Sequence, residues 1–138
     1  MGTWDKDTIT NFVHSWYSRL NDHAPFEEVR AMLSNDGIEM RFPETTLTTY
    51  PQFEAWYKGV TGTFFNQSHI VQKLEVTMNG DTAELAVTVN WRAHTWQPPQ
   101  AYSTWINAVA GQKWKVVRDP ATGNPLIQKY IVETFKTL

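Results

Sequence analysis

The N-terminal half of the chain has the hydrophobic pattern of three helices. The first helix is expected to begin at Asp7, and Asp7 or Thr8 is suited to cap its first turn. Pro25 predicts the opening of a second, short helix that ends near residues 34–37, and Pro51 predicts the opening of a third. The apolar positions of the first helix are Ile9, Phe12, Val13, Trp16, Tyr17 and Leu20. Those of the third are Phe53, Trp56, Tyr57, Val60 and Phe64.

Apolar and polar residues alternate in much of the remaining chain, as they do in β-strands. Residues 38–42 predict a short strand that stops at Pro43. Residues 69–78 and 82–95 predict two long strands joined at Asn79-Gly80, a residue pair that two-residue hairpin turns prefer. The second of these strands is so long that we expect a bend or a bulge in it.

A second hairpin and a last strand are expected near the C-terminus. Residues 101–109 and 113–118 flank Ala110-Gly111-Gln112, whose small residues predict the turn between two strands. Residues 126–135 predict the last strand, after a segment rich in Pro, Gly and Asn. Helices followed by a run of antiparallel strands define the α+β class, so we expect one α+β domain over residues 1–138.

Composition and charge narrow the classes of function. The net charge of −2 and the lack of a basic run disfavour nucleic-acid binding. The chain has no Cys, which excludes disulfides and thiolate ligands. No run approaches the roughly 18 apolar residues of a membrane span, and the N-terminus lacks a signal core, so we expect a cytoplasmic protein without a membrane partner. Seven Trp, seven Phe and five Tyr suit a large core, a ligand pocket or both.

Four short segments carry a family resemblance, in an order that spans most of the chain. They are Asp36–Pro43, Phe53–Tyr57, His69 at a strand start, and Gly80–Ala83. Together they resemble the SnoaL-like branch of the nuclear transport factor 2-like superfamily. The resemblance implies a cystatin-like cone, in which three N-terminal helices pack in a strongly curved, mostly antiparallel sheet around a deep cavity. The superfamily contains polyketide cyclases, ketosteroid isomerase, scytalone dehydratase, limonene epoxide hydrolase and members that only bind or dimerise, so the fold does not choose a reaction.

His69 is the first candidate for acid–base chemistry. It resembles the strand-opening histidine that scytalone dehydratase uses, and imidazole suits proton transfer near neutral pH. Strict alternation puts His69 on the face opposite Leu74, Val76 and Met78, however. An inward His69 therefore requires a bulge between these positions.

Three further residues are catalytic candidates, each with a structural alternative. Tyr17 falls near the place where ketosteroid isomerase keeps an oxyanion-stabilising tyrosine, and Tyr57 is a second hydroxyl on a helix face. Either tyrosine is suited to hold a ligand oxygen or to be an ordinary helix-face aromatic. Asp36 is suited to orient the imidazole or to form a helix-terminating turn. Phe42 stands where the isomerase carries its base, so that base is missing.

A shell of large apolar residues is predicted to contact a ligand, with plain core as the alternative for each member. The members are Trp16, Met40, Phe42, Trp56, Phe65 or its neighbour Phe64, and Trp91. Such a shell with one or two polar groups suits a small, ring-containing molecule. His14 and His23 are too far apart for a helical metal site, and no phosphate-binding loop occurs, so we expect neither a metal nor a cofactor.

Two functions remain as hypotheses. The leading one is a small hydrophobic ligand bound in an internal cavity, with cofactor-free chemistry of the cyclase, dehydratase or isomerase type if the protein is an enzyme. The alternative is a non-catalytic ligand-binding or dimerisation module. Under both hypotheses we expect a homodimer through the open sheet face, with His94, Arg92, Trp96 and Trp105 as candidates for the interface.

Overall fold

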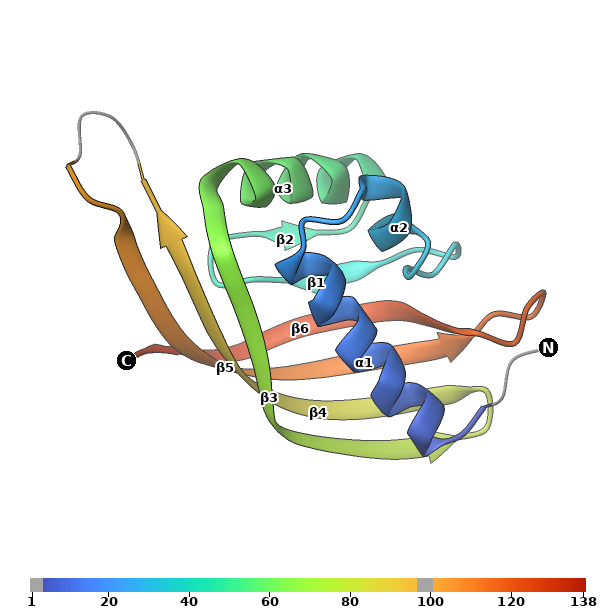
Figure 1. The fold of residues 1–138 in the computed structure, drawn as a ribbon. Helices are drawn as coiled ribbons and strands as arrows, with labels where there is room; N and C mark the ends of the chain where they lie inside the picture. The colour runs from blue at the N-terminus through green and yellow to red at the C-terminus, as the bar shows by residue number, and fades with distance from the viewer. Residues whose placement is uncertain (1–3, 97–100) are drawn as a thin grey trace.

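The computed structural model describes residues 4–96 and 101–138. In the described part of the chain, three helices cover one face of a single sheet with the strand order β2-β1-β6-β5-β4-β3 (Figure 1). All neighbouring strands are antiparallel except β1 and β6, which are parallel. The elements are α1 (Lys6–Asn21), α2 (Phe26–Arg30), β1 (Glu39–Arg41), β2 (Thr46–Leu47), α3 (Tyr50–Thr63), β3 (Phe64–Asn79), β4 (Thr82–Thr95), β5 (Thr104–Arg118) and β6 (Pro125–Thr137). The α+β prediction is confirmed, whereas the strong curvature of the sheet stays a prediction.

The first two helices begin or end at other residues than the pattern predicted. Asp5 caps α1, because its carboxylate accepts a hydrogen bond of 2.8 Å from the backbone N–H of Thr8. The prediction of Asp7 or Thr8 as the cap was wrong. The helix α2 ends at Arg30, earlier than predicted, because the next residues pair with β6: the backbone N–H of Ser34 donates to the carbonyl oxygen of Ile127.

The helix α3 opens as predicted and continues through its glycines. Thr49 and Gln52 form a reciprocal capping box, and Pro51 lies in the first turn, where its missing N–H costs no hydrogen bond. Phe53 and Tyr57 bury one face of the helix. The cap and this burial outweigh the cost of glycine, since the helix reaches Thr63.

The strand β3 contains two irregularities that decide which way its side chains point. It starts at Phe64, before the predicted start at His69, and its pairing with β4 shifts between Phe65 and Ser68 and again between Val71 and Lys73. The second shift is the bulge that an inward His69 requires. It brings His69 to the helix-covered face of the sheet, where Leu74 also packs.

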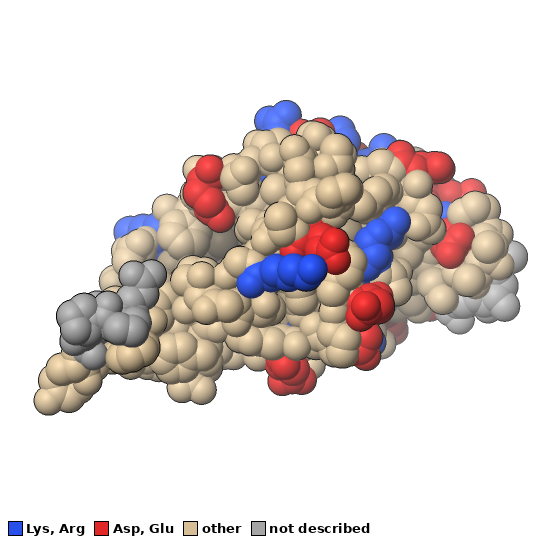
Figure 2. Space-filling view, turned by 90° about the horizontal axis from the view of Figure 1, so that it is seen from above, with Lys and Arg blue, Asp and Glu red and all other residues tan. Residues whose placement is uncertain are grey.

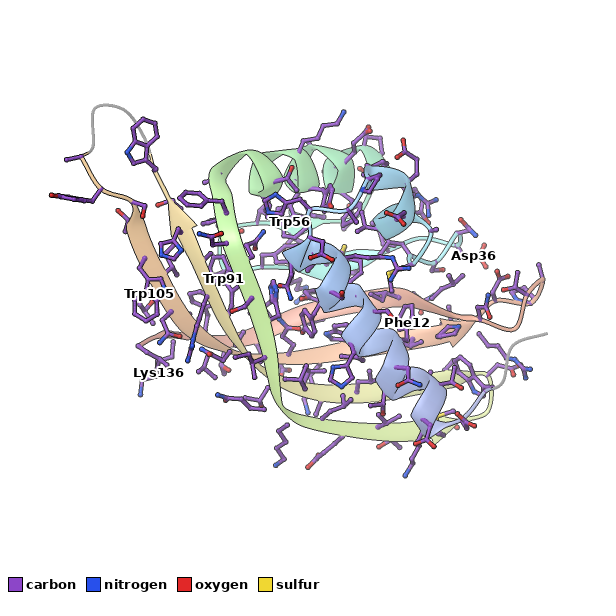
Figure 3. All side chains as sticks on the ribbon, viewed as in Figure 1. Phe12, Asp36, Trp56, Trp91, Trp105 and Lys136 are labelled. Carbon is purple, nitrogen blue, oxygen red and sulfur yellow. The ribbon has the colours of Figure 1, made fainter. Side chains whose placement is uncertain are left out.

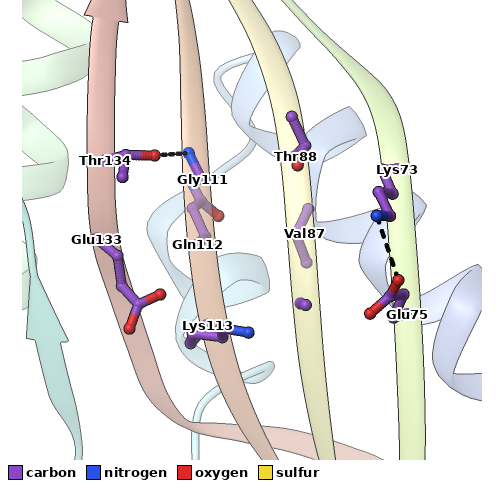
Figure 4. Close-up of a pocket in the computed structure, with 10 residues that line it drawn as sticks. Lys73, Glu75, Val87, Thr88, Gly111, Gln112, Lys113, Glu133 and Thr134 are labelled. Atoms are coloured by element: carbon purple, nitrogen blue, oxygen red, sulfur yellow. Dashed lines mark hydrogen bonds and ion pairs between the residues drawn. The ribbon is translucent and has the colours of Figure 1, made fainter.

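The predicted second hairpin around residues 110–112 was wrong, because β5 is one continuous strand. Gly111 pairs with Thr88 of β4 and Thr134 of β6, and its N–H donates to the Thr134 hydroxyl at 3.1 Å (Figure 4). A Cβ atom on Gly111 would overlap that hydroxyl oxygen. The glycine therefore permits close approach within the sheet, and it is not a turn residue. As a consequence, the side chain of Gln112 enters the core.

We predict that Gly111→Ala lowers the free energy of unfolding by about 1–2 kcal/mol, because the Thr134 side chain must rotate away and the hydrogen bond is lost. Gly59→Ala is the matched control. Gly59 lies in α3 with open space around it, so the same added methyl should stabilise by about 0.5–1 kcal/mol. Urea denaturation measures both, and equal effects of the two substitutions would contradict the close-approach role.

Candidate functional site

Aromatic rings fill the space between the helices and the middle of the sheet. The ring of Trp16 lies 6.4 Å from that of Phe53, 6.4 Å from that of Trp114 and 5.8 Å from that of Tyr130. Trp16 and Met40 are fully buried. Both are predicted to contact a ligand, and in the structure both belong to the packed core.

A group of polar side chains is buried among these rings. The Oε1 atom of Gln112 accepts hydrogen bonds from the hydroxyl of Tyr17 at 2.7 Å and from Nε1 of Trp114 at 2.9 Å. Tyr130 and Tyr17 both pack against the ring of Trp114. Burial, together with the neighbouring Tyr130, raises the pKa of Tyr17 well above its usual value. The Tyr17 hydroxyl is thus protonated and already bonded inside the core. Sequence reasoning missed Gln112 because Ala-Gly-Gln has the composition of a turn.

His69 lies at the edge of this core, directly against Tyr17. The two rings stack with centroids 4.9 Å apart and an interplanar angle of 17°. The Nδ1 atom of His69 lies 2.6 Å from Oδ1 of Asn21, the last residue of α1. Burial lowers the pKa of His69 to about 4, so the ring is neutral near pH 7.

The hydrogen bond to Asn21 also fixes the protonation pattern of the His69 ring. An amide oxygen only accepts, so Nδ1 carries the hydrogen and donates it to Asn21. The other nitrogen, Nε2, then has a lone pair, and it has no hydrogen-bond partner among residues 4–96 and 101–138. His69 is therefore held as a neutral imidazole whose Nε2 is available as a hydrogen-bond or proton acceptor.

A second hydrogen-bonded row runs beside His69. Trp91, which pairs with His69 across the sheet, donates from Nε1 to Oε1 of Gln67 at 3.1 Å. The Nε2 atom of Gln67 lies 2.8 Å from Nε2 of His23. We call Asn21, His23, Gln67, His69 and Trp91 the histidine site. Of these five, the sequence predicted only His69 and Trp91 as site residues, since the other three contact partners distant in sequence.

Rings from two strands surround Trp91 on the helix-covered face. The edge of Phe64 meets Trp91 at 5.0 Å and 81°, and Phe135 lies 6.3 Å away. Phe65, by contrast, is exposed and stacks on His94, which lies on the opposite face. Of the two neighbouring phenylalanines, Phe64 is thus the one at the histidine site, and the choice of Phe65 was wrong because the shift after Phe65 changes the alternation.

Two residues next to the histidine site have left-handed backbone, His23 with φ 50° and Asn66 with φ 51°. His23 lies just after the C-terminus of α1. Its N–H donates to the carbonyl oxygen of Leu20, and that of Ala24 donates to the carbonyl oxygen of Arg19. This pattern usually has glycine at the position of His23. A left-handed non-glycine residue costs about 1 kcal/mol, so both residues hold the chain in a conformation that the local sequence does not favour.

The remaining predicted residues lie apart from the imidazole or have structural contacts. The hydroxyl of Tyr57 donates to the carbonyl oxygen of Ala24 and so ties α3 to the end of α1. Asp36 is exposed in the loop before β1, at the far end of the molecule from Trp91 (Figure 3). The side chain that orients His69 is Asn21, in the role predicted for Asp36.

Trp56 and Phe42 form a half-buried pair under α3. Their rings stack with centroids 4.4 Å apart, and Trp56 points from α3 toward the sheet (Figure 3). The Nε1 atom of Trp56 is buried without a hydrogen-bond partner in the described part of the protein. A buried donor without a partner is uncommon and is accounted for by strain or by a bound polar group.

The surface charges and hollows of the described residues do not indicate a second functional site. Basic and acidic side chains are interspersed on the face shown in Figure 2. Within the described residues, no three His, Cys, Asp or Glu side chains are grouped to hold a metal ion. One hollow of about 230 Å³ lies on the sheet face away from the helices, beside Lys73, Glu75 and Gly111 (Figure 4), and another of about 380 Å³ lies beside Arg19. Neither is lined by the histidine site.

The chain belongs to the SnoaL-like domain family, whose profile matches residues 2–124. No curated protein matches its sequence. Among solved structures, a candidate dehydratase of the NTF2-like family from Streptomyces avermitilis superposes with a TM-score of 0.75 at 13% identity, covering 97% of each chain. A candidate scytalone dehydratase from Novosphingobium aromaticivorans DSM 12444 gives 0.68 at 15% identity, covering 96% of this chain and 86% of its own.

A third similar structure is a protein of unknown function with a cystatin-like fold from Nostoc punctiforme PCC 73102, with a TM-score of 0.73 at 14% identity over 96% of this chain and 92% of that one. At such low identities these structures show the NTF2-like fold alone. In the described part of this chain, no helix has the length and apolar character to cross a membrane.

The depressed pKa of His69 predicts that stability falls with acid. The unfolded histidine titrates near 6.5 and the folded one near 4, so between these values the unfolded chain binds more protons. The contribution is present above pH 6.5 and is lost as the pH falls toward 4. Because the ring keeps some contact with solvent, we expect a loss of about 2 kcal/mol.

Urea denaturation from pH 7.5 to pH 4 measures this loss. His69→Asn is the control, since it keeps a polar side chain and removes the titration. The stability curve of His69→Asn should be flatter than that of the wild-type protein. Parallel curves would show that His69 titrates normally in the folded state.

Proposed function

We propose that the protein binds a small ring-containing hydrophobic molecule at the histidine site, and that His69 transfers a proton there without a cofactor, in a reaction of the dehydratase, isomerase or cyclase type. The observation that carries the proposal is the state of His69. It is a half-buried, neutral imidazole, oriented by Asn21 and stacked on the ring of Tyr17, and its Nε2 has no hydrogen-bond partner among the described residues. Strongly perturbed, oriented histidines are frequent at functional sites.

The surroundings of His69 suit an apolar ring. Trp91 is the cross-strand neighbour of His69, and Phe64 and Phe135 lie against Trp91. Stacked or edge-on aromatic contacts hold planar ligands. The unpartnered Nε1 of Trp56 is a hydrogen-bond donor for a polar group of a ligand under α3. Apolar walls with few polar groups are typical of small-molecule sites.

The chemistry follows from a fixed lone pair. With Nδ1–H bonded to Asn21, Nε2 accepts a proton from a carbon next to a carbonyl group. The C–H electron pair then forms the C=C bond of the enolate, and the π pair of the carbonyl group moves to its oxygen. Asn21 supports the imidazolium through its oxygen. Tyr17 serves as the platform of this imidazole, since its hydroxyl is bonded to Gln112, and we do not assign it to a ligand oxygen. The fold shared with two candidate dehydratases agrees with this class of reaction.

Binding can be tested with α-tetralone, a small bicyclic ketone, by isothermal titration calorimetry. Wild-type protein should bind it, and Trp91→Ala should weaken binding at least about tenfold because a stacking surface is lost. Trp105→Ala is the matched control, since Trp105 lies on the opposite face of the sheet. Equal loss in both variants, or no binding to the wild-type protein, would contradict the proposed site.

Proton transfer can be tested separately by exchange of the α-hydrogens of α-tetralone in D₂O, followed by NMR. We expect exchange above the buffer rate with the wild-type protein and none above it with His69→Asn, while α-tetralone binding persists in the variant. Binding without exchange in the wild-type protein would support the alternative, a non-catalytic binding module.

A homodimer through the outer sheet face, which points away from the helices, is a second proposal that stands beside the first. Three large apolar residues of β3 and β5 are exposed there: Phe65 to 40%, Ile70 to 49% and Trp105 to 56%. On the same face lie charges of both signs, with the ion pair Lys73–Glu75 near Lys113 and Glu133 (Figure 4). Apolar residues beside a mixture of charges suit a self-complementary interface.

Substitution of an apolar residue by a charged one tests this interface. If the protein is a dimer, Trp105→Glu should shift the dissociation constant at least about tenfold toward monomer, measured by analytical ultracentrifugation. Thr77→Glu, an exposed position toward the other end of β3, should leave it unchanged. A wild-type protein that stays monomeric at high micromolar concentration would end this proposal.

A further inference from the structure

Trp91, Gln67 and His23 form a chain of hydrogen bonds, and Trp91 determines which atom of each bond donates. The indole Nε1 of Trp91 can only donate, so the Gln67 atom that it meets must be the amide oxygen. The amide nitrogen of Gln67 therefore faces His23 and donates to it. His23 must accept through Nε2, and its ring hydrogen lies on Nδ1.

Backbone geometry holds both members of the Gln67–His23 bond in place. His23 occupies the left-handed position at the end of α1 that glycine usually takes, and Asn66, directly before Gln67, is left-handed as well. A helix end needs no imidazole at this position. A histidine at this glycine-favouring position is explained if its imidazole has a function.

The two histidines of the site then have opposite free nitrogens. His69 gives its Nδ1 hydrogen to Asn21 and keeps a lone pair on Nε2, whereas His23 accepts at Nε2 and keeps a hydrogen on Nδ1. Both hydrogen bonds join the end of α1 to the same part of β3. His69 bonds to Asn21, and His23 bonds to Gln67, which lies two residues before His69. The site thus offers one fixed acceptor and one fixed donor.

We propose that His23 is a ligand-binding residue whose Nδ1–H donates to the carbonyl oxygen of the bound molecule, so that the site selects ring-containing ketones over hydrocarbons of the same shape. This inference rests on the proposed function, because it assumes a ligand at the histidine site. It adds His23 as the residue that recognises the carbonyl oxygen of the ligand. Gln67 and Trp91 fix the tautomer of the His23 ring.

The tautomer can be measured directly by long-range ¹H–¹⁵N correlation NMR of the histidine rings. In the wild-type protein, His23 should show a hydrogen on Nδ1. In Gln67→Glu a carboxylate faces the ring and can only accept, so the hydrogen should move to Nε2. An Nε2–H tautomer in the wild-type protein, or an unchanged tautomer in the variant, overturns the inference.

Ligand selection can be measured with α-tetralone and tetralin, which share a skeleton and differ in the carbonyl oxygen. His23→Gly suits the left-handed backbone and removes the donor. It should weaken α-tetralone binding about fivefold and leave tetralin binding unchanged, since one hydrogen bond is lost. His23→Asn, which also tolerates this backbone, is a second variant in case glycine loosens the end of α1.

The outcomes separate this inference from the proposed function. If the wild-type protein binds both compounds and His23→Gly changes neither, or changes both equally, the role of His23 is overturned and the binding site stands. If the wild-type protein binds neither compound, the proposed function fails and this inference fails with it. A loss confined to α-tetralone supports both.

Discussion

The shift in pairing between Val71 and Lys73 determines on which side of the sheet His69 lies. Successive side chains of a strand point to opposite faces, so a regular β3 with Leu74 in the core would place the imidazole in solvent. The extra residue reverses the alternation, and His69 meets the end of α1. Three features of His69 depend on this irregularity: its hydrogen bond to Asn21, its contact with Tyr17 and its reduced exposure to solvent.

The buried polar group around Gln112 connects the core to the histidine site. Gln112 binds the hydroxyl of Tyr17, and the other side of that tyrosine ring supports His69. An amide buried among indole and phenol rings is acceptable because its oxygen receives two hydrogen bonds. The packing of the core thereby sets the position of the imidazole without any direct contact between Gln112 and His69.

Local sequence signals predicted the elements whose formation is decided locally. The face of α1, the opening of α3 near Pro51 and the Asn79-Gly80 hairpin all follow from neighbouring residues. The error at residues 110–112 came from a tertiary contact. Gly111 has the composition of a turn, but Thr134 on the next strand requires a residue without a side chain there. Asp5, two residues before the predicted cap, shows the usual uncertainty at helix ends.

The candidate site could be predicted in part for the same reason. His69 and Trp91 were recognisable from residue type and strand position, and the need for a bulge followed from the alternation. Asn21, His23 and Gln67 are ordinary polar residues, and only the fold brings them together. The sequence did not distinguish Phe64 from Phe65. The shift in pairing between Phe65 and Ser68 decides that Phe64 is the one that faces Trp91.

The contact of Tyr17 with both Gln112 and His69 has a consequence for how this protein can diverge. Substitutions around Trp114 that alter the hold on Gln112 would tilt the tyrosine ring and, with it, the imidazole. Under the proposed function, ligand preference would then change through residues that never touch a ligand. Chains with identical histidine sites would then differ in specificity for this reason, and libraries that test the proposed function should include the residues beneath Tyr17.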